Sequence, residues 1–152
     1  MESRIITGAM IVAVIVAATI SGGCMEKSGV EVDDVVLEQV RRYADPVTEQ
    51  ILVAMNENDY VKYTEDFDQT MKNAMTEAVF DETNAVIRSK IGDYVSKEFW
   101  KAESKDQYII AQYKAKFTDE PADVTVRVVF QEINGTMKVS GLWLDSPELR
   151  KP

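Results

Sequence analysis

The sequence contains no histidine and only one cysteine, Cys24. Histidine is the commonest general base at neutral pH and the commonest metal ligand. Its absence excludes Ser-His-Asp triads, Cys-His pairs and histidine zinc sites, and one cysteine cannot form a disulfide within the chain. The sequence also lacks a glycine-rich phosphate loop and a paired metal-binding motif. We therefore expect no cofactor and no metal site.

The chain also lacks a concentrated basic region. Its 17 Lys and Arg residues are scattered among 26 Asp and Glu residues, which gives a net charge of −9. A protein that binds nucleic acid needs a basic surface, so nucleic acid is excluded as a partner. The acidic balance is typical of a solvated protein surface.

The N-terminus carries an uncharged hydrophobic run over residues 5–20, preceded by Arg4. A membrane-spanning helix needs about 20 apolar residues, so this shorter run is typical of a signal peptide. Ser21-Gly22-Gly23-Cys24 resembles a lipoprotein lipobox, in which small residues precede a cysteine that becomes lipid-modified. Ser21 departs from that pattern, which usually has a leucine-like residue there. The alternative is an uncleaved anchor helix, and both interpretations place the remaining chain at the extracytoplasmic face of the cell membrane.

One domain is expected after this segment. The predicted boundaries are a signal peptide or membrane anchor over 1–23, the lipidated Cys24 and a flexible linker over 24–31, a single domain over 32–147 and a tail over 148–152. A domain of this size buries roughly two-thirds of the surface that its unfolded chain exposes. It therefore needs neither a metal ion nor a disulfide to fold.

Apolar residues in the first half of the domain recur with a helical period. Val32, Val36, Val40 and Tyr43 form one such stripe. Asp45-Pro46 is expected to restart or kink the helix, since Pro is favoured in a first helical turn. Asp59 and Asp68 are expected to cap later helices, and Gly92 to end the last one.

From Tyr94 onward the period changes to two, which predicts half-buried antiparallel strands. The predicted strands are 94–101, 109–117, 124–131 and 136–144, and Asn134-Gly135 is a strong signal for a tight hairpin turn. Helices followed by strands predict an α+β fold, with the N-terminal helices packed on one face of a curled four-stranded antiparallel sheet.

Several short motifs match the pattern of a known family. They are Asn58-Asp59-Tyr60, Phe67-Asp68, Ile91-Gly92-Asp93-Tyr94, Tyr113-Lys114-Ala115-Lys116-Phe117 and Val139-Ser140-Gly141-Leu142-Trp143. With these motifs the chain resembles the domain of unknown function 3887 family of prokaryotic lipoproteins. The order of elements resembles the nuclear-transport-factor-2-like (cystatin-like cone) superfamily. Cone-fold proteins include enzymes, carriers and assembly modules, so the resemblance implies a fold and brings no catalytic residues.

Acidic clusters are the first candidate sites. Asp66 with Asp68, and Asp119 with Glu120 and Asp123, carry the carboxylate oxygens that calcium prefers. Neither spacing matches a known calcium loop, so solvated or capping carboxylates are the favoured interpretation.

Aromatic residues are the second candidates, because eight of them are concentrated in the strand half. They are Tyr94, Phe99, Trp100, Tyr108, Tyr113, Phe117, Phe130 and Trp143. Most are expected to fill the core. Tyr94, Trp100 and Trp143 are the candidate contact residues if a cavity or an exposed sheet face binds a ligand or partner.

Two further predictions concern the surface. Asn134-Gly135-Thr136 is an N-glycosylation sequon at the predicted hairpin tip. Val129, Ile133, Leu142 and Leu144 are expected on the outer face of the sheet, where apolar residues favour dimerisation.

The sequence therefore favours a membrane-tethered, extracytoplasmic binding or assembly module that is not an enzyme. Its site is expected in a cavity between sheet and helices or on a sheet face. The expected partners are the membrane, through lipid at Cys24 or an N-terminal helix, and either a second copy of the chain or a membrane protein. The alternative is a small cone-fold hydrolase or isomerase that uses a buried carboxylate.

Overall fold

The fold is described by a computed structural model over residues 29–152. Cys24 and the hydrophobic run over residues 5–20 lie outside the described residues. Four helices lie between the first and the second strand: α1 (Asp34–Glu57), α2 (Tyr60–Thr64), α3 (Gln69–Ala74) and α4 (Glu77–Ile91). The strands are β1 (Val30–Glu31), β2 (Tyr94–Lys105), β3 (Tyr108–Phe117), β4 (Glu120–Ile133) and β5 (Thr136–Asp145).

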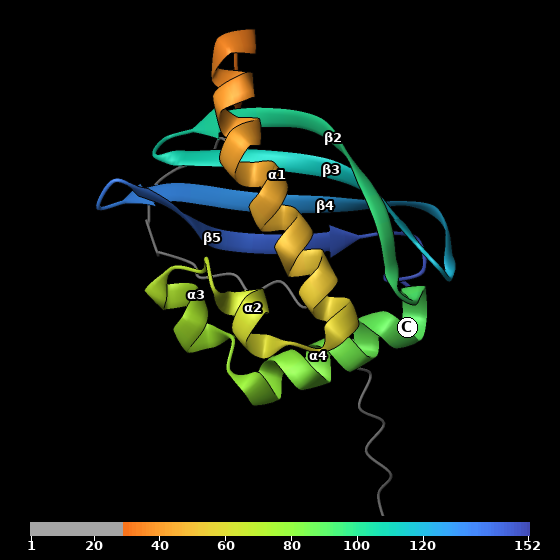
Figure 1. The fold of residues 1–152 in the computed structure, drawn as a ribbon. Helices are drawn as coiled ribbons and strands as arrows, with labels where there is room; N and C mark the ends of the chain where they lie inside the picture. The colour runs from red at the N-terminus through yellow and green to blue at the C-terminus, as the bar shows by residue number, and fades with distance from the viewer. Residues whose placement is uncertain (1–28) are drawn as a thin grey trace, which may run out of the picture.

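The five strands form one antiparallel sheet in the order β1-β2-β3-β4-β5. Figure 1 shows α1 crossing one face of this sheet, with α2, α3 and α4 grouped beyond β5. The predicted α+β class, with helices on an antiparallel sheet, is confirmed. The prediction of four strands is wrong, because β1 adds a fifth at the edge of β2. A two-residue strand has too little alternation to be recognised in a polar stretch.

Local sequence explains where the elements begin and end. Asp59 and Asp68 accept hydrogen bonds from the backbone amides of Lys62 and Met71, as predicted for N-caps. Asn134 and Gly135 both have positive φ, at 53° and 77°, as the predicted tight hairpin turn requires. Gly92 ends α4 with φ of 76°.

Helix α1 passes through Pro46 without interruption, so the helix does not restart at Asp45-Pro46, and the alternative of a kink stays a prediction. Proline removes one backbone donor, whose acceptor would be the carbonyl of Arg42. Arg42 and Pro46 both lie on the exposed side of the helix, where water can satisfy that carbonyl. The buried residues Ala44, Thr48 and Ile51 continue one apolar face through this point.

The core lies between α1 and the inner face of the sheet, which we define as the face toward the helices. Strands β3 and β4 supply alternating side chains to it, and those of Tyr113, Val128 and Phe130 are almost wholly buried. The Phe130 ring meets the Tyr43 ring of α1 edge-on, with centroids 5.2 Å apart. Aromatic contacts of this kind fix α1 across the middle of the sheet.

Two β-bulges decide which side chains face away from the core. In β2 the pairing shifts between Phe99 and Lys101, so Trp100 is an extra residue. In β5 the pairing shifts at Ser140, between Val139 and Gly141. Each shift reverses the alternation of the residues that follow it.

The second bulge overturns part of the prediction for the outer face. Leu142 pairs with Val128 and Leu144 with Val126, and both of these valines point into the core. Leu142 is therefore buried, and Leu144 packs against the core from a half-buried position. Val129 lies on the opposite face from Val128 and is also buried.

Candidate functional site

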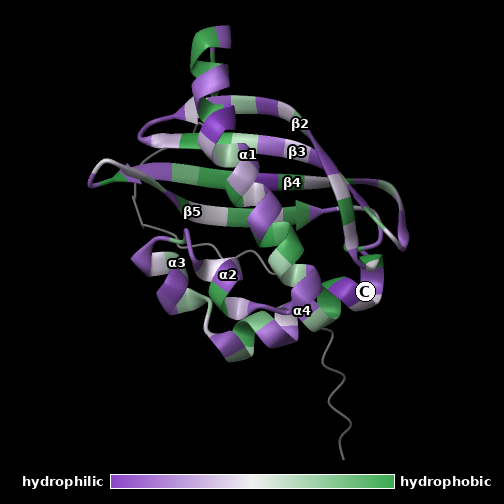
Figure 2. Cartoon of the chain, viewed as in Figure 1, coloured by the Kyte–Doolittle hydropathy of each residue, from purple (hydrophilic) through white to green (hydrophobic). Residues whose placement is uncertain are grey.

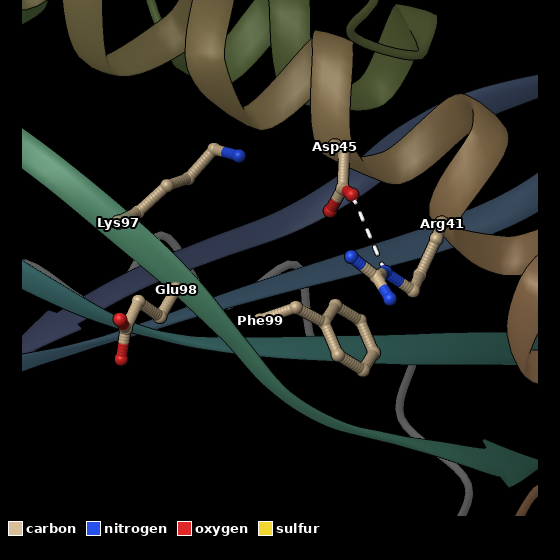
Figure 3. Close-up of a pocket in the computed structure, with 5 residues that line it drawn as sticks. All are labelled: Arg41, Asp45, Lys97, Glu98 and Phe99. Carbon is tan, nitrogen blue, oxygen red and sulfur yellow. Dashed lines mark ion pairs between the residues drawn. The ribbon is translucent and has the colours of Figure 1, made fainter.

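An open cleft of about 430 Å³ lies between α1 and the inner side of β2 (Figure 3). Its lining residues are Arg41, Asp45, Lys97, Glu98 and Phe99. Arg41 and Asp45 lie one turn apart on α1, so both project toward β2. Glu98 turns away from the other four in Figure 3, which leaves Asp45 as the carboxylate inside.

A continuous polar network crosses this cleft. The Arg41 guanidinium lies 3.4 Å from Asp45, whose carboxylate also accepts a 2.9 Å hydrogen bond from the Tyr113 hydroxyl. The Lys97 ammonium lies 4.7 Å from the centre of the Tyr113 ring. It also lies 3.6 Å from the Glu49 carboxylate, although the Lys97 side chain is only 10% exposed. The cations and carboxylates that enter the cleft therefore neutralise one another.

The two tyrosines that donate to carboxylates of this network remain protonated. Burial raises the pKa of Tyr113, and its hydrogen bond to Asp45 raises it further. Burial likewise raises the pKa of Tyr94, whose hydroxyl donates a 2.7 Å hydrogen bond to Glu49. Both hydroxyls act as donors to carboxylates, so neither is a general base at neutral pH. Ion pairs and tyrosine hydrogen bonds therefore hold the charged side chains of the cleft in fixed positions.

The outer face of the sheet, which is the face away from the helices, carries both tryptophans. Trp100 is 50% exposed, although tryptophan is normally well buried in a folded domain. The ammonium groups of Lys101 and Lys114 lie 5.0 and 4.0 Å from the centre of its ring. These are cation–π distances, and the bulge at Trp100 places Trp100 and Lys101 on the same face.

Trp143 lies across the sheet on the same face, with the Arg127 guanidinium 5.5 Å from its ring centre. The ring tip covers Gly141, where a Cβ would approach two Trp143 carbons to within 2.6 Å. Glycine therefore allows the indole to lie against the backbone. We name Trp100, Lys101, Lys114, Arg127 and Trp143 the aromatic–cationic strip.

Two cations of this strip have no carboxylate within ion-pair distance among residues 29–152. Lys101 pairs with Glu103, whereas Lys114 donates only to the Thr125 hydroxyl, at 2.9 Å. Arg127 is exposed. Within residues 29–152, neither Lys114 nor Arg127 forms an ion pair. They stand out because most basic side chains of this acidic domain are paired with a carboxylate.

The predicted contact residues divide between the two faces. Trp100 and Trp143 share the outer face, where the aromatic–cationic strip brings them together with basic groups. Tyr94 is buried on the inner side, where its ring packs edge-on against Phe117 at 5.8 Å. Tyr94 therefore belongs with the cleft and the core.

Carboxylates of the predicted acidic clusters form hydrogen bonds and ion pairs within the domain. Asp68 is buried and accepts hydrogen bonds from Ser140 and Gln131. Asp66 pairs with Lys138, and Glu120 accepts from the Glu148 amide. No group of three residues suited to a metal ion occurs within residues 29–152. Asn134 lies at the exposed β4–β5 turn, and its glycosylation stays a prediction.

Sequence reasoning missed the cleft residues Arg41, Asp45 and Lys97 as a group. No local pattern links them, because α1 and β2 meet only through the tertiary fold. Lys114 and Arg127 did show a signal, since both occupy the polar side of the strand alternation. Their association with the tryptophans required the positions of two bulges.

Comparison with known proteins places the chain in a family. No curated protein matches it. Among solved structures it is similar to Bdellovibrio bacteriovorus Bd1075, with a TM-score of 0.47, 11% identity, and coverage of 76% of this chain and 44% of that chain. The chain thus spans less than half the length of that protein. In residues 29–152 no helix is both long and apolar enough to span a membrane. The profile of a family described as protein of unknown function (DUF3887) matches residues 48–142, more than half of the sequence, and the chain belongs to this family.

Proposed function

We propose that the chain is a binding or assembly module, held at the extracytoplasmic face of a membrane, that contacts its partner through the outer face of its sheet. The aromatic–cationic strip carries this proposal. Trp100 is half exposed, and two cations that form no ion pair among the described residues lie beside the two tryptophans. Tryptophan and arginine are enriched among the residues that dominate binding energy.

The sequence supports the membrane location, through the hydrophobic run and the lipobox-like motif that ends at Cys24. The proposed fold is a curled, cone-like sheet of the nuclear-transport-factor-2-like kind. Proteins with that architecture include carriers, assembly modules and enzymes, so the architecture alone does not distinguish these roles. A binding role is supported by the exposed tryptophan and the cations of the outer face, and by the paired charges of the cleft.

Anchoring is tested by mass spectrometry of the full-length protein isolated from its own membranes. We expect a mature N-terminus at Cys24 that carries lipid. We expect no lipid modification in the Cys24→Ser variant. An intact Met1 with an unmodified Cys24 would leave the anchor-helix alternative in place of the lipoprotein.

Partner binding is tested by recovery of the full-length protein from solubilised membranes. Trp100→Ala is compared with Val61→Ala, because Val61 is 75% exposed on α2 and lies far from the strip in sequence and fold. We expect Trp100→Ala to lose the partner and Val61→Ala to retain it. Equal retention by two folded variants would contradict a role for the outer face in binding a membrane protein.

The alternative function is a hydrolase or isomerase that uses the cleft. The hydrogen bond between the Asp45 carboxylate and the Tyr113 hydroxyl favours it, because a carboxylate and a protonated tyrosine can transfer and stabilise a proton. A screen of hydrolase and isomerase substrates decides between the two. If a substrate is turned over, and Asp45→Asn abolishes this activity while Trp100→Ala retains it, the function is enzymatic and the binding proposal is wrong.

A further inference from the structure

We propose that the outer face of the sheet docks on the anionic phospholipid surface of the membrane that holds the chain. This inference rests on the proposed function, and it assigns the lipid surface as the partner of the aromatic–cationic strip. Three independent features carry it: the distribution of charge between the two layers, the chemistry of the strip, and the short connection to the N-terminal segment.

Charge is divided unequally between the helical layer and the sheet. The segment from Glu31 to Asp93 carries 15 acidic and six basic residues, whereas Tyr94 to Pro152 carries nine of each. The whole net charge of −9 therefore belongs to the helical part, and the strand part is neutral. Figure 2 shows how prominent hydrophilic residues are on α1, α3 and α4. An anionic surface repels the negatively charged helical layer, so the sheet is the side that can approach it.

The strip supplies the two residue types that favour the boundary between lipid and water. Tryptophan is enriched at this boundary because its indole has an apolar body and a polar N–H group. Lysine and arginine near the surface are attracted by anionic lipid headgroups. Lys114 and Arg127 can take part in this attraction, since neither forms an ion pair within the described part of the chain, although Glu98 lies opposite Lys114 on the neighbouring strand.

The connection to the N-terminal segment is short enough to impose this contact. Five residues, Met25 to Gly29, separate Cys24 from the first residue of β1. Even fully extended, they span at most about 18 Å. Strand β1 pairs with the end of β2, at Glu103 and Ser104, close in sequence to Trp100. A lipid at Cys24 therefore keeps the edge of the sheet beside the membrane, and tethering raises the effective concentration of a weak binding face.

The two tryptophans provide a direct measurement, because they are the only ones in the chain and both lie on the outer face. Full-length protein is reconstituted into vesicles of phosphatidylcholine alone, or of phosphatidylcholine and phosphatidylglycerol in equal parts. Each vesicle type is prepared with and without brominated acyl chains, which quench nearby tryptophan fluorescence. Trp143→Phe isolates the signal of Trp100, and Trp100→Phe isolates that of Trp143.

We expect brominated lipid to quench both tryptophans in the vesicles that contain phosphatidylglycerol, and less in phosphatidylcholine alone. Removal of two basic groups, in Lys114→Gln with Arg127→Gln, shifts the docking equilibrium roughly 25-fold toward the undocked state. The matched control is Arg42→Gln with Lys72→Gln, which removes the same charge from the helical layer and leaves the quenching unchanged. Circular dichroism verifies that both double variants are folded.

Three results would overturn the lipid surface as the partner. In the first, aqueous iodide quenches the tryptophans but brominated lipid does not. In the second, brominated lipid quenches them equally in the two vesicle types, and in the third the two double variants lose quenching by brominated lipid to the same extent. If lipid does not quench the tryptophans but Trp100→Ala still loses a protein from solubilised membranes, the partner is that protein and the proposed function stands. If lipid does not quench the tryptophans and Trp100→Ala also loses no protein, the proposed function fails with the inference.

Discussion

Gly141 allows the Trp143 ring to lie against the backbone on the outer face, because the ring occupies the space that a side chain at position 141 would take. We predict that Gly141→Ala displaces the indole and leaves the fold intact, since the atoms that a Cβ would meet first are the far end of the Trp143 side chain. In the Trp100→Phe background, the emission of Trp143 should shift to longer wavelength as the ring becomes more exposed. An unchanged spectrum would mean that the ring is not held against the backbone at this position.

Asp68 is a buried carboxylate that joins the helices to the sheet. It accepts hydrogen bonds of 2.7 Å from the Met71 amide and from the Ser140 hydroxyl, and one of 3.1 Å from Gln131. Loss of an N-cap costs about 1 kcal/mol, and leaving buried donors unsatisfied adds about 1–3 kcal/mol. We predict that Asp68→Ala lowers the free energy of unfolding, measured with urea, by about 2–4 kcal/mol.

The neighbouring Asp66 provides the matched control for this change. Its carboxylate is partly exposed and forms one ion pair, with Lys138 at 3.7 Å. Exposed pairs contribute about 0–1 kcal/mol, so Asp66→Ala should have a small effect. Similar losses at both positions would contradict the structural role assigned to Asp68.

Glu120 links the start of β4 to the C-terminal segment. Its hydrogen bond with Ser146, followed by that from the Glu148 amide, lowers the pKa of its carboxyl. A carboxyl with a lowered pKa in the folded state stabilises the protein above its unfolded pKa, and this contribution is lost as the pH falls through the folded pKa. We predict that unfolding by urea becomes easier as the pH falls below about 4.5, and that Glu120→Gln flattens this dependence.

Glu132→Gln is the control for this pH series, because Glu132 is exposed near the far end of the same strand. It should follow the parent protein across the acid range. If Glu120→Gln and the parent lost stability in parallel, the hydrogen bonds of Glu120 would not be the source of the dependence.

At the scale of elements, local sequence predicts each feature that depends on neighbours along the chain. The caps at Asp59 and Asp68, the end of α4 at Gly92 and the Asn134-Gly135 turn all follow from residue chemistry. The positions of Leu142 and Leu144 could not be predicted this way. A bulge at Ser140 reverses their alternation, and its hydroxyl is directed to Asp68, which is distant in sequence.

The contact between Phe130 and Tyr43 joins β4 to α1 across the core. Phe130 is 1% exposed and meets Tyr43 of α1 edge-on. Truncation of a buried phenylalanine costs about 3–5 kcal/mol. We predict that Phe130→Ala lowers the free energy of unfolding by this amount, whereas Val95→Ala, at a position 61% exposed, changes it by less than about 0.5 kcal/mol. A Phe130→Ala variant with unchanged stability would contradict this account of the core.

At the scale of the whole molecule, the domain has two surfaces of opposite character. The cleft between α1 and β2 holds charges that neutralise one another, from Arg41 and Asp45 to Lys97 and Glu49. The outer face of the sheet presents tryptophans beside cations that remain unpaired among the described residues. The sequence predicted the aromatic candidates, but only the pairing of strands separates those that fill the core from those that face outward.

Phe99 and Trp100 allow these two surfaces to be compared at adjacent positions. Phe99 lines the cleft, whereas Trp100 lies on the outer face, because consecutive residues of a strand face opposite sides of the sheet. The most direct measurement replaces each in turn with a photoreactive phenylalanine derivative in the full-length protein in its own cells. After irradiation, we predict adducts at position 100 and none at position 99. Adducts confined to position 99 would contradict the account and assign the function to the cleft.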